Sequence, residues 1–276
     1  MQWRRQKSVN QGRTLTDKTL NRENIVLRQI IKHAVKRGYF SKDQAPVIES
    51  LKEQPNRRPN FTREEYATLR KTAHKRIAET AKTDLKEQRR LLYDFIIFMA
   101  NTGIRPSEAK QLRWRHVDFK DKLIKLDAAI TKNKKPREVV GRDPAITRMR
   151  AIRRRQTAFL KLHGQSIKPS DFVFSLPNTA DGNAQLDRVH SFKTSFRSLL
   201  KACGFEYDEH NERHSITSLR HTYATLRLIE GTTIDGLADN MGTSIRMIQN
   251  HYGHVTTEER RDDLTKMRAK SGSNDA

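Results

Sequence analysis

The sequence predicts an α+β protein that is mostly α-helical and contains a small antiparallel sheet. Two observations lead to this fold class. Apolar residues recur at helical spacing through most of the chain, whereas residues 117–141 change to the shorter period of strands. In that region Leu123–Leu126 and Glu138–Val140 flank a lysine-rich turn at 131–136, as the two strands of a hairpin would. A further short strand is expected at Phe172–Phe174.

The composition points to a polyanionic partner. The 276-residue chain contains 55 Lys and Arg against 32 Asp and Glu, a formal net charge of +23. Because Lys and Arg release counterions when they bind phosphates, double-stranded DNA is the first expected partner, ahead of a membrane surface. The sequence contains neither an apolar run of membrane-spanning length nor the apolar core of a signal peptide. We therefore expect a cytoplasmic, nucleoid-associated protein.

The N-terminal part of the chain predicts a basic arm, two helices and a linker. Residues 1–15 are polar and basic and are expected to form the arm. Thr16 can cap a helix that runs to about Gly38, and a second, short helix is expected at Pro46–Glu53. Residues 54–60 contain two prolines and two arginines, a composition typical of a linker.

Strong helix signals follow the linker. Thr62 and Glu65 have the spacing of a capping box. A later helix is expected to stop at Gly103, and Pro106 suits the first turn of the next one. Further helices are expected at residues 143–164, 187–203, around 219–226, 234–241, 245–252 and 258–267.

The residue types present suit phosphodiester chemistry without a metal. Such chemistry requires a nucleophile, positive charge on the non-bridging oxygens and an acid for the leaving oxygen. The sequence contains no HExxH motif, no paired aspartates in a turn and only one cysteine, Cys203, so we expect neither a metal site nor a cofactor. Arginines are placed at helix starts. Arg105 follows the helix end at Gly103, and Arg220 lies one turn after Thr217.

Four segments resemble, in the right order, the motifs of the tyrosine recombinases, the phage integrase family. TGIRPSEAKQLRWRHVDF (102–119) resembles the first arginine box, and SLRHTYATLRLIEG (218–231) resembles the second. MGTSIRMIQNHYGH (241–254) resembles the segment that ends in the nucleophilic tyrosine, and the basic turn at 131–135 lies where the family has its lysine. Any one box is a weak signal, whereas four in order are specific.

The resemblance implies a site-specific DNA recombinase or integrase with the DNA breaking-rejoining fold. Tyr252 is expected to attack the scissile phosphate and form a 3′-phosphotyrosyl intermediate. Arg105 and Arg220 are expected to hold the non-bridging oxygens, for which a planar guanidinium is suited. Lys132 is expected to protonate the leaving 5′ oxygen, with Lys134 as the alternative donor if the turn has another register.

Three further positions are auxiliary in this interpretation. Glu108, one turn after the first arginine, resembles the family's supporting acidic position. The family usually has His three residues before the second arginine and His or Trp nine residues before the tyrosine, but Thr217 and Thr243 occupy these positions. A threonine hydroxyl can hydrogen-bond a phosphate, but it is no base near neutral pH. The general base is therefore left open.

Structural interpretations of these positions compete with the functional ones. Thr243 can simply cap a helix that starts at Ile245, and Thr217 can cap its own helix. Histidines lie nearby in the sequence, but none occupies the family's position. His221, next to Arg220, is expected to point away from the helix face of that arginine.

The resemblance also implies the architecture and the assembly. Residues 1–55 would be the end of a helical core-binding region, 56–60 a linker, and 61–276 the catalytic domain with its C-terminal tail. Because the core-binding region is short, we expect weaker site binding than that of a full clamp. A homotetramer on two DNA attachment sites is expected, with accessory DNA-bending or directionality factors as candidate partners. The source would be a phage or another mobile genetic element, and residues 253–276 are placed for exchange between subunits.

One alternative function uses the same C-terminal stretch. Residues 233–251 also match the spacing of small and apolar residues in a helix-turn-helix. On that interpretation the protein is a non-catalytic DNA-binding regulator or an architectural protein, and Tyr252 is incidental. A helix-turn-helix requires neither Arg105 nor Lys132, so the positions of these residues relative to the tyrosine distinguish the two hypotheses.

Overall fold

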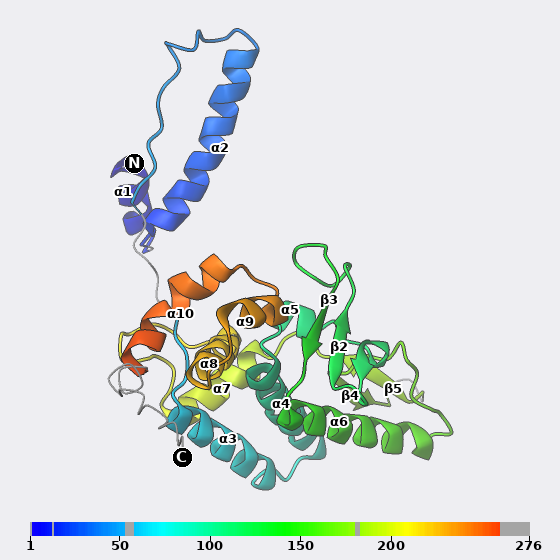
Figure 1. Ribbon diagram of the computed structural model, residues 1–276. Helices are drawn as coiled ribbons and strands as arrows, with labels where there is room; N and C mark the ends of the chain where they lie inside the picture. Colours follow the sequence, from blue (N-terminus) through cyan, green and yellow to red (C-terminus); the bar gives the residue numbers. More distant parts are fainter. Residues whose placement is uncertain (1, 13, 53–57, 180–182, 260–276) are drawn as a thin grey trace, which may run out of the picture. The chain divides into compact units, whose positions relative to one another are not determined.

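The computed structural model describes residues 2–12, 14–52, 58–179 and 183–259 (Figure 1). The chain divides into two compact units, Met1–Asn56 and Arg57–Ala276. Within the described ranges, none of the helices combines the length and the apolar character needed to cross a bilayer. The fold class is confirmed, because most of the described elements are helices and the sheets are small and antiparallel.

The described part of the first unit contains two helices. Helix α1 (Gln2–Asn10) replaces the arm expected at residues 1–15. Helix α2 (Asp17–Lys36) begins as predicted, because the Thr16 hydroxyl accepts a hydrogen bond from the backbone N–H of Thr19 at 3.3 Å.

The short helix expected at Pro46–Glu53 is wrong for the described residues 46–52, which form an irregular segment. Side chains of α2 bind the backbone of that segment. The Asn21 side chain exchanges two hydrogen bonds with the backbone of Leu51, at 2.8 and 2.9 Å, and Arg28 Nε donates to the Ile48 carbonyl at 2.9 Å. These side chains form hydrogen bonds with backbone groups that would otherwise be paired within a helix. The segment is therefore stable in an irregular conformation.

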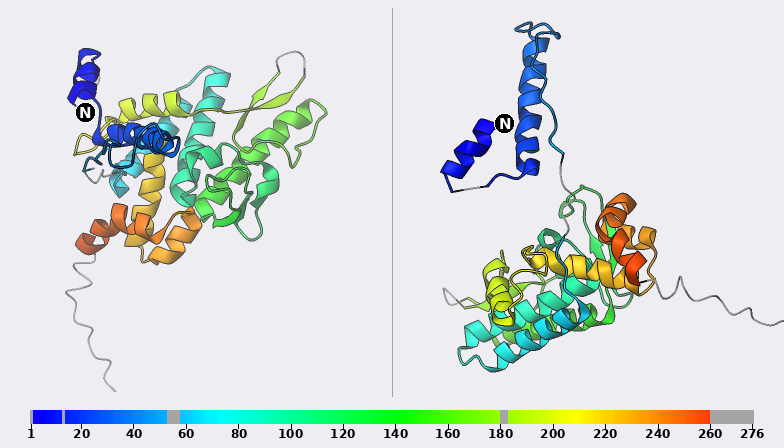
Figure 2. Two further views of the ribbon diagram at one scale, coloured as in Figure 1. Left: turned by 90° about the horizontal axis from the view of Figure 1, so that it is seen from above. Right: turned by 90° about the vertical axis from the view of Figure 1, so that its left-hand side faces the viewer.

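The second unit is organised around helix α4 (Thr83–Thr102), whose second half is almost completely buried. Helices α3 (Arg63–Ala78), α6 (Asp143–Leu162) and α8 (Ile216–Ile229) pack against it (Figures 1 and 2). Helix α7 (Lys193–Cys203) packs against α3. The main hydrophobic core lies between these helices and the sheet.

The predicted hairpin is confirmed. Strand β2 (Leu123–Leu126) pairs antiparallel with β3 (Arg137–Val140), and β1 (Val117–Asp118) extends the sheet on the other edge of β2. Ile124 and Val139 are directly paired and fully buried. The sheet thereby presents the lysine-rich turn at the end of the hairpin.

The further strand expected at Phe172–Phe174 is displaced along the chain. The regular strand is β4 (Ser175–Asn178), which pairs with β5 (Gln185–Arg188). Phe172 forms only an isolated bridge with Arg113. The apolar side chains that follow it are buried in the core, and their backbone does not continue the pairing. Since β5 uses residues at the start of the helix expected at 187–203, helix α7 begins later, at Lys193.

The helix boundaries after the linker match the prediction and place the first arginine. Thr62 and Glu65 form the expected capping box, with hydrogen bonds of 2.8 and 3.1 Å. Gly103 ends α4 with a φ of 65°, and an added Cβ there would lie 2.3 Å from the Tyr223 ring. Helix α5 (Pro106–Ala109) follows directly. The break therefore depends on glycine and brings the next residues against α8.

The C-terminal helices form a small core of their own. Helix α9 (Ile234–Met241) ends at Gly242, and α10 (Ile245–Glu259) follows. Both helices pack against α8, as Figure 2 shows. Their buried residues, with those of the second half of α8, make a cluster distinct from the main core. Side chains after Tyr252, and the helix and tail exchange expected beyond Glu259, lie outside the described residues.

Candidate active site

Arg220 lies on the buried face of α8 and reaches the end of α4. Its guanidinium donates a hydrogen bond to the carbonyl of Gly103, the residue that ends α4. Burial, and then the nearby charge of Arg105, lower the pKa of Arg220 to about 10. The side chain therefore remains a cation at neutral pH.

Arg105 links two helix junctions. It lies between the end of α4 and the start of α5, and its Nη1 donates to Glu108 Oε1 at 2.9 Å. Its Nη2 donates to the backbone carbonyl of Gly242, between α9 and α10. Arg105 thus ties the start of α5 to the turn that precedes the helix of Tyr252.

Glu108 is the buried carboxylate at the centre of this network. It is fully buried and also accepts two hydrogen bonds from Arg137, at 2.6 and 3.1 Å. Burial alone would raise its pKa, but the hydrogen bonds and charges of Arg137 and Arg105 hold the pKa below the ordinary value of a glutamate. The carboxylate is therefore charged and fixes both guanidiniums.

The two candidate lysines lie in the turn between β2 and β3. Both side chains are exposed, and neither ammonium forms an ion pair with the part of the chain that the structure describes. The backbone N–H of Lys132 lies 3.5 Å from Glu108 Oε1, so the turn starts beside the buried carboxylate. Lys134 adopts a φ of 56°, the left-handed conformation of a tight turn.

Tyr252 is buried against α8. Its hydroxyl is hydrogen-bonded to Nδ1 of His221, and the two ring centroids are 5.8 Å apart. Burial raises the pKa of Tyr252 to about 12, against the opposing effect of the Arg220 and Arg58 charges. The phenol is thus protonated at neutral pH and shares a hydrogen bond with an imidazole.

The expected direction of His221 is confirmed, and the structure adds the partner that the sequence did not reveal. The side chain does leave the helix face of Arg220, but it points to α10 and contacts the tyrosine hydroxyl. Burial, followed by the charges of Arg58 and Arg220, lowers the pKa of His221 to about 3, so the imidazole is neutral. Successive helical residues diverge by roughly 100°, so the residue after a buried arginine faces the next packed helix.

The two threonines do not cap their helices. Ser215 is the N-cap residue of α8, and Thr217 lies inside the first turn. At α10 the Ser244 hydroxyl, not Thr243, accepts the backbone N–H of Met247, at 3.2 Å. Both capping interpretations are therefore wrong, and both threonines are half-buried.

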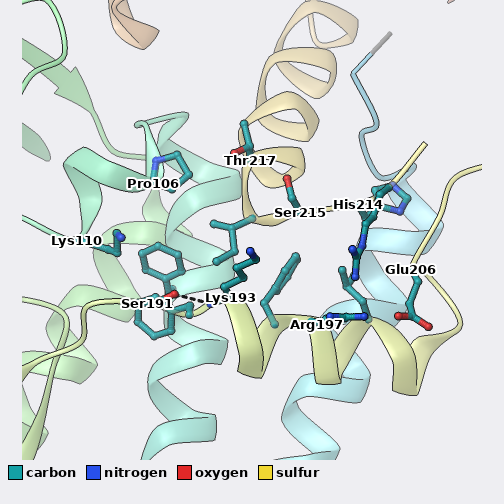
Figure 3. A pocket seen from close by; sticks show the side chains of 15 residues that line it. Pro106, Lys110, Ser191, Lys193, Arg197, Glu206, His214, Ser215 and Thr217 are labelled. Atoms are coloured by element: carbon teal, nitrogen blue, oxygen red, sulfur yellow. Dashed lines mark hydrogen bonds between the residues drawn. The ribbon is translucent and has the colours of Figure 1, made fainter. Parts of the chain in front are cut away.

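A cavity of about 350 Å³ lies beside Thr217, between α5, α7 and the start of α8 (Figure 3). Neither of the two candidate arginines nor Tyr252 lines it. Figure 3 places Thr217 and Pro106 at one side of the cavity, opposite α7. The lining combines aromatic and basic side chains, among them Phe95, Phe192, Phe196, Lys110, Lys193 and Arg197.

Two charged residues that lie at this site were not identified from the sequence. Arg58, within the expected linker, lies close enough to lower the pKa values of both His221 and Tyr252. Arg137, the first residue of β3, is the second partner of Glu108. The signal that the sequence offers for Arg137 is its place on the hairpin that also carries Lys132, directly after the basic turn. The sequence contains no comparable signal for Arg58.

Within the described ranges, no group of three or more His, Cys, Asp or Glu is arranged to hold a metal ion. The polar groups around Tyr252 are instead cations, an imidazole and one fully paired carboxylate. This arrangement suits an anionic group with several oxygens, such as a phosphate.

The fold is that of the tyrosine recombinases. The crystal structure of XerA recombinase has a TM-score of 0.52 and 19% sequence identity, covering 92% of this chain and 84% of that chain. A Tn1549 transposon integrase in complex with a circular intermediate DNA has a TM-score of 0.63 and 16% identity, covering 92% and 80%. XerH recombinase bound to a palindromic difH substrate has a TM-score of 0.60 and 15% identity, covering 91% and 67%.

The chain belongs to the phage integrase family, whose sequence profile matches residues 61–259. Comparison with curated proteins gave no significant match. The family assignment therefore comes from the profile, and the solved structures, at 15–19% identity, add the fold.

Proposed function

We propose that this protein is a site-specific DNA recombinase that cuts and rejoins strands through a phosphotyrosyl intermediate at Tyr252. The observation that carries the proposal is a convergence of charge. Arg105 and Arg220 come from distant parts of the sequence. The Arg105 charge lowers the pKa of Arg220, and the Arg220 charge in turn opposes the raised pKa of Tyr252. A regulator that only binds DNA has no need of this arrangement around a buried tyrosine.

The two arginines are suited to hold the non-bridging oxygens of the scissile phosphate. Each guanidinium has five N–H donors in a fixed plane. The network uses a few of them on Glu108 and on the carbonyls of Gly103 and Gly242, so others remain for a phosphate. Because the network fixes the guanidiniums before substrate arrives, little reorganisation is needed in the transition state.

Lys132 is proposed to protonate the 5′ oxygen that leaves, with Lys134 as the alternative. Its backbone is anchored beside Glu108 while its side chain is exposed. A flexible ammonium can reach the leaving oxygen after DNA has bound, and it donates a proton more readily than a guanidinium does. The buried Glu108 and the half-buried Thr217 and Thr243 are proposed as supporting residues that position the phosphate-binding groups.

The proposed reaction conserves the energy of the phosphodiester. The tyrosyl ester replaces the broken P–O bond, so a 5′-hydroxyl from a partner strand can reverse the step without metal or nucleotide cofactor. The Tn1549 integrase and XerH structures are described as complexes with DNA. By analogy we propose double-stranded DNA sites as the partner of this chain, with a homotetramer as the working assembly and accessory DNA-bending or directionality factors as further partners.

The alternative function, a DNA-binding regulator, rests on α9 and α10. These helices are joined by a short turn, and α10 exposes apolar residues, with Ile245 48% and Met247 38% exposed. Such a surface suits a groove of DNA equally well in a regulator and in a recombinase. Chemistry at Tyr252 therefore has to decide between the two functions.

The experiment begins with duplexes selected from a random pool for binding to the full chain. A nick is then introduced at successive positions of the selected duplex, so that a short 5′-hydroxyl fragment leaves after cleavage and traps the intermediate. We expect a denaturation-resistant protein–DNA adduct in EDTA with the wild type and none with Tyr252→Phe. Selected binding without an adduct at any nick position would establish the regulator instead.

A further inference from the structure

The proton of the Tyr252 hydroxyl needs an acceptor during the proposed attack. Burial holds the pKa of this phenol at about 12, so the group enters the reaction protonated. Neither Thr217 nor Thr243 is a base near neutral pH. Glu108 is fully occupied by two arginines. The acceptor has to be sought among the groups that contact the hydroxyl itself.

Among the described residues, one side chain makes that contact. Nδ1 of His221 is hydrogen-bonded to the Tyr252 hydroxyl, and the two residues are 6% and 5% exposed. The contact joins α8 to α10, and the adjacent Arg220 points from the same turn of α8 toward Gly103. A single helical turn therefore presents one cation for the phosphate and one imidazole for the nucleophile.

We infer that His221 accepts the proton of Tyr252 while the tyrosine oxygen attacks phosphorus. This inference rests on the proposed function. In the cleavage step the bond from Tyr252 Oη to phosphorus forms and the bond from phosphorus to the 5′ oxygen breaks. The phenolic proton moves to His221 Nδ1, and Lys132 supplies a proton to the 5′ oxygen. In the rejoining step the same protons return, so no oxidant, reductant or co-reactant is consumed.

The groups that face His221 explain how a weakly basic imidazole can serve. Arg58 from the segment before α3, Arg220 from α8 and His251 from α10 all oppose its protonation, and Tyr252 is its hydrogen-bond partner. In the free protein the ring is neutral, and its Nδ1 is an acceptor when the ring proton is on Nε2. A bound phosphate brings a negative charge next to Arg220 and offsets the cations. Substrate binding thereby makes His221 more basic.

The competing explanation is that His221 only holds Tyr252 in place. Two substitutions separate the roles. In His221→Asn the side-chain amide keeps a hydrogen-bond acceptor close to the position of Nδ1 but takes no proton, whereas His221→Ala removes both capacities. A proton acceptor predicts that both variants are slow, while a mere holding role predicts that only His221→Ala is slow.

The test measures single-turnover adduct formation on the nicked duplex described above. We expect both variants to lose about 100-fold or more in rate, as is usual when a general base is removed. The matched control is His74→Asn. His74 also packs its ring against a tyrosine, Tyr93, with centroids 5.5 Å apart, but on α3 and α4. This control should react within about twofold of the wild type, since no proton transfer is assigned to His74.

Two readouts detect the proton itself. The adduct rate of His221→Asn should rise with pH, because hydroxide replaces the missing base, while the wild-type rate changes little between about pH 7 and 9. Incorporation of a fluorinated tyrosine at position 252, with a more acidic hydroxyl, should restore part of the rate in His221→Asn. These measurements remain informative if His221→Ala folds poorly.

Each outcome decides the inference. A His221→Asn rate within threefold of the wild type, a rate above it, or a lack of rescue by fluorotyrosine would overturn the role of His221. A rate above the wild type would instead identify the contact as a restraint on the nucleophile. If the wild type itself forms no adduct, the proposed function fails first, and the two failures are thereby distinguished.

Discussion

The positive charges offered to DNA at this site come from two kinds of structure. Arg105 and Arg220 are held by a buried carboxylate and by backbone carbonyls at two helix junctions. Lys132 stands in an exposed turn, and only its backbone approaches the same carboxylate. We call the first region the arginine network (Arg105, Glu108, Arg137 and Arg220) and the second the lysine turn (residues 131–136).

In the proposed reaction, this difference would meet two separate demands of phosphoryl transfer. Charge that stabilises the transition state is most effective when it is fixed in advance, because a preorganised donor does not have to reorient during the reaction. An acid that protonates a leaving oxygen has to stay close to it as the oxygen moves away. A flexible lysine side chain can move its ammonium group in this way. The positions of the guanidiniums in the arginine network therefore depend on the folded core. In the lysine turn, only the position of the backbone depends on it.

The largest effect is expected from the loss of Arg220 in the arginine network. Arg220→Ala removes a fixed donor and should lower adduct formation by about 1,000-fold. The loss of one such donor typically costs about 100- to 1,000-fold, and a guanidinium can donate two hydrogen bonds to a phosphate. Arg220→Lys should recover only a small part. The control is Lys161→Ala, which removes an exposed charge at the end of α6. Near-normal adduct formation in Arg220→Ala would remove the network from the chemistry.

The lysine turn should show a smaller loss, and one that depends on the leaving group. Lys132→Ala is expected to slow adduct formation about 100-fold without changing the thermal midpoint, because the side chain is exposed. A substrate with sulfur in place of the bridging 5′ oxygen needs no acid and should restore the rate. Lys134→Ala is the comparison and should react almost normally. The opposite pattern would assign the proton to Lys134.

The junction between the arginine network and α10 can be tested through stability. Gly242 has a φ of 63°, and an added Cβ would lie 2.6 Å from Arg137 Nε. Gly242→Ala should therefore lose about 1–2 kcal/mol to backbone strain and a further amount to the clash with the guanidinium. Gly204→Ala is the matched control, because Gly204 ends α7 with a φ of 73° and has open space. Equal losses in the free energy of unfolding, measured with denaturant, would mean that the Arg137 side chain moves aside without cost.

The smallest effect is expected at Thr243. Thr243→Val keeps the shape of the side chain and removes only the hydroxyl, so adduct formation should fall about threefold or less, the value of one exchangeable hydrogen bond. Its backbone N–H, bonded to the Ala238 carbonyl at 2.9 Å, is unaffected. A loss as large as that of Lys132→Ala would show that this hydroxyl binds the phosphate in the transition state.

The sequence predicted those parts of the fold that depend on local chemistry. Thr62 with Glu65, the helix end at Gly103, and the hairpin around the lysine turn are each determined by a few neighbouring residues, and all three are confirmed. The displaced strand β4 and the irregular segment beside α2 depend on partners distant in the sequence. Spacing along a chain contains no signal for such partners.

The candidate site divides along the same line. Motif spacing identified Arg105, Arg220 and Tyr252, and the structure brings them to one place. It did not identify Arg137 or the contact of His221 with Tyr252, because both depend on which elements pack together. Family motifs thus named the groups that are expected to touch substrate, while the groups that support them appeared only in three dimensions.

Tyr252 belongs to the smaller of the two hydrophobic clusters, which α8, α9 and α10 form apart from the main core. Opening free energies differ within one protein, and elements with fewer buried contacts open most readily. Helix α10 is therefore expected to open at a lower free energy than α4, which lies in the main core. Exposure of Tyr252 is thus expected to follow a local equilibrium of its own, separate from the global unfolding of the domain.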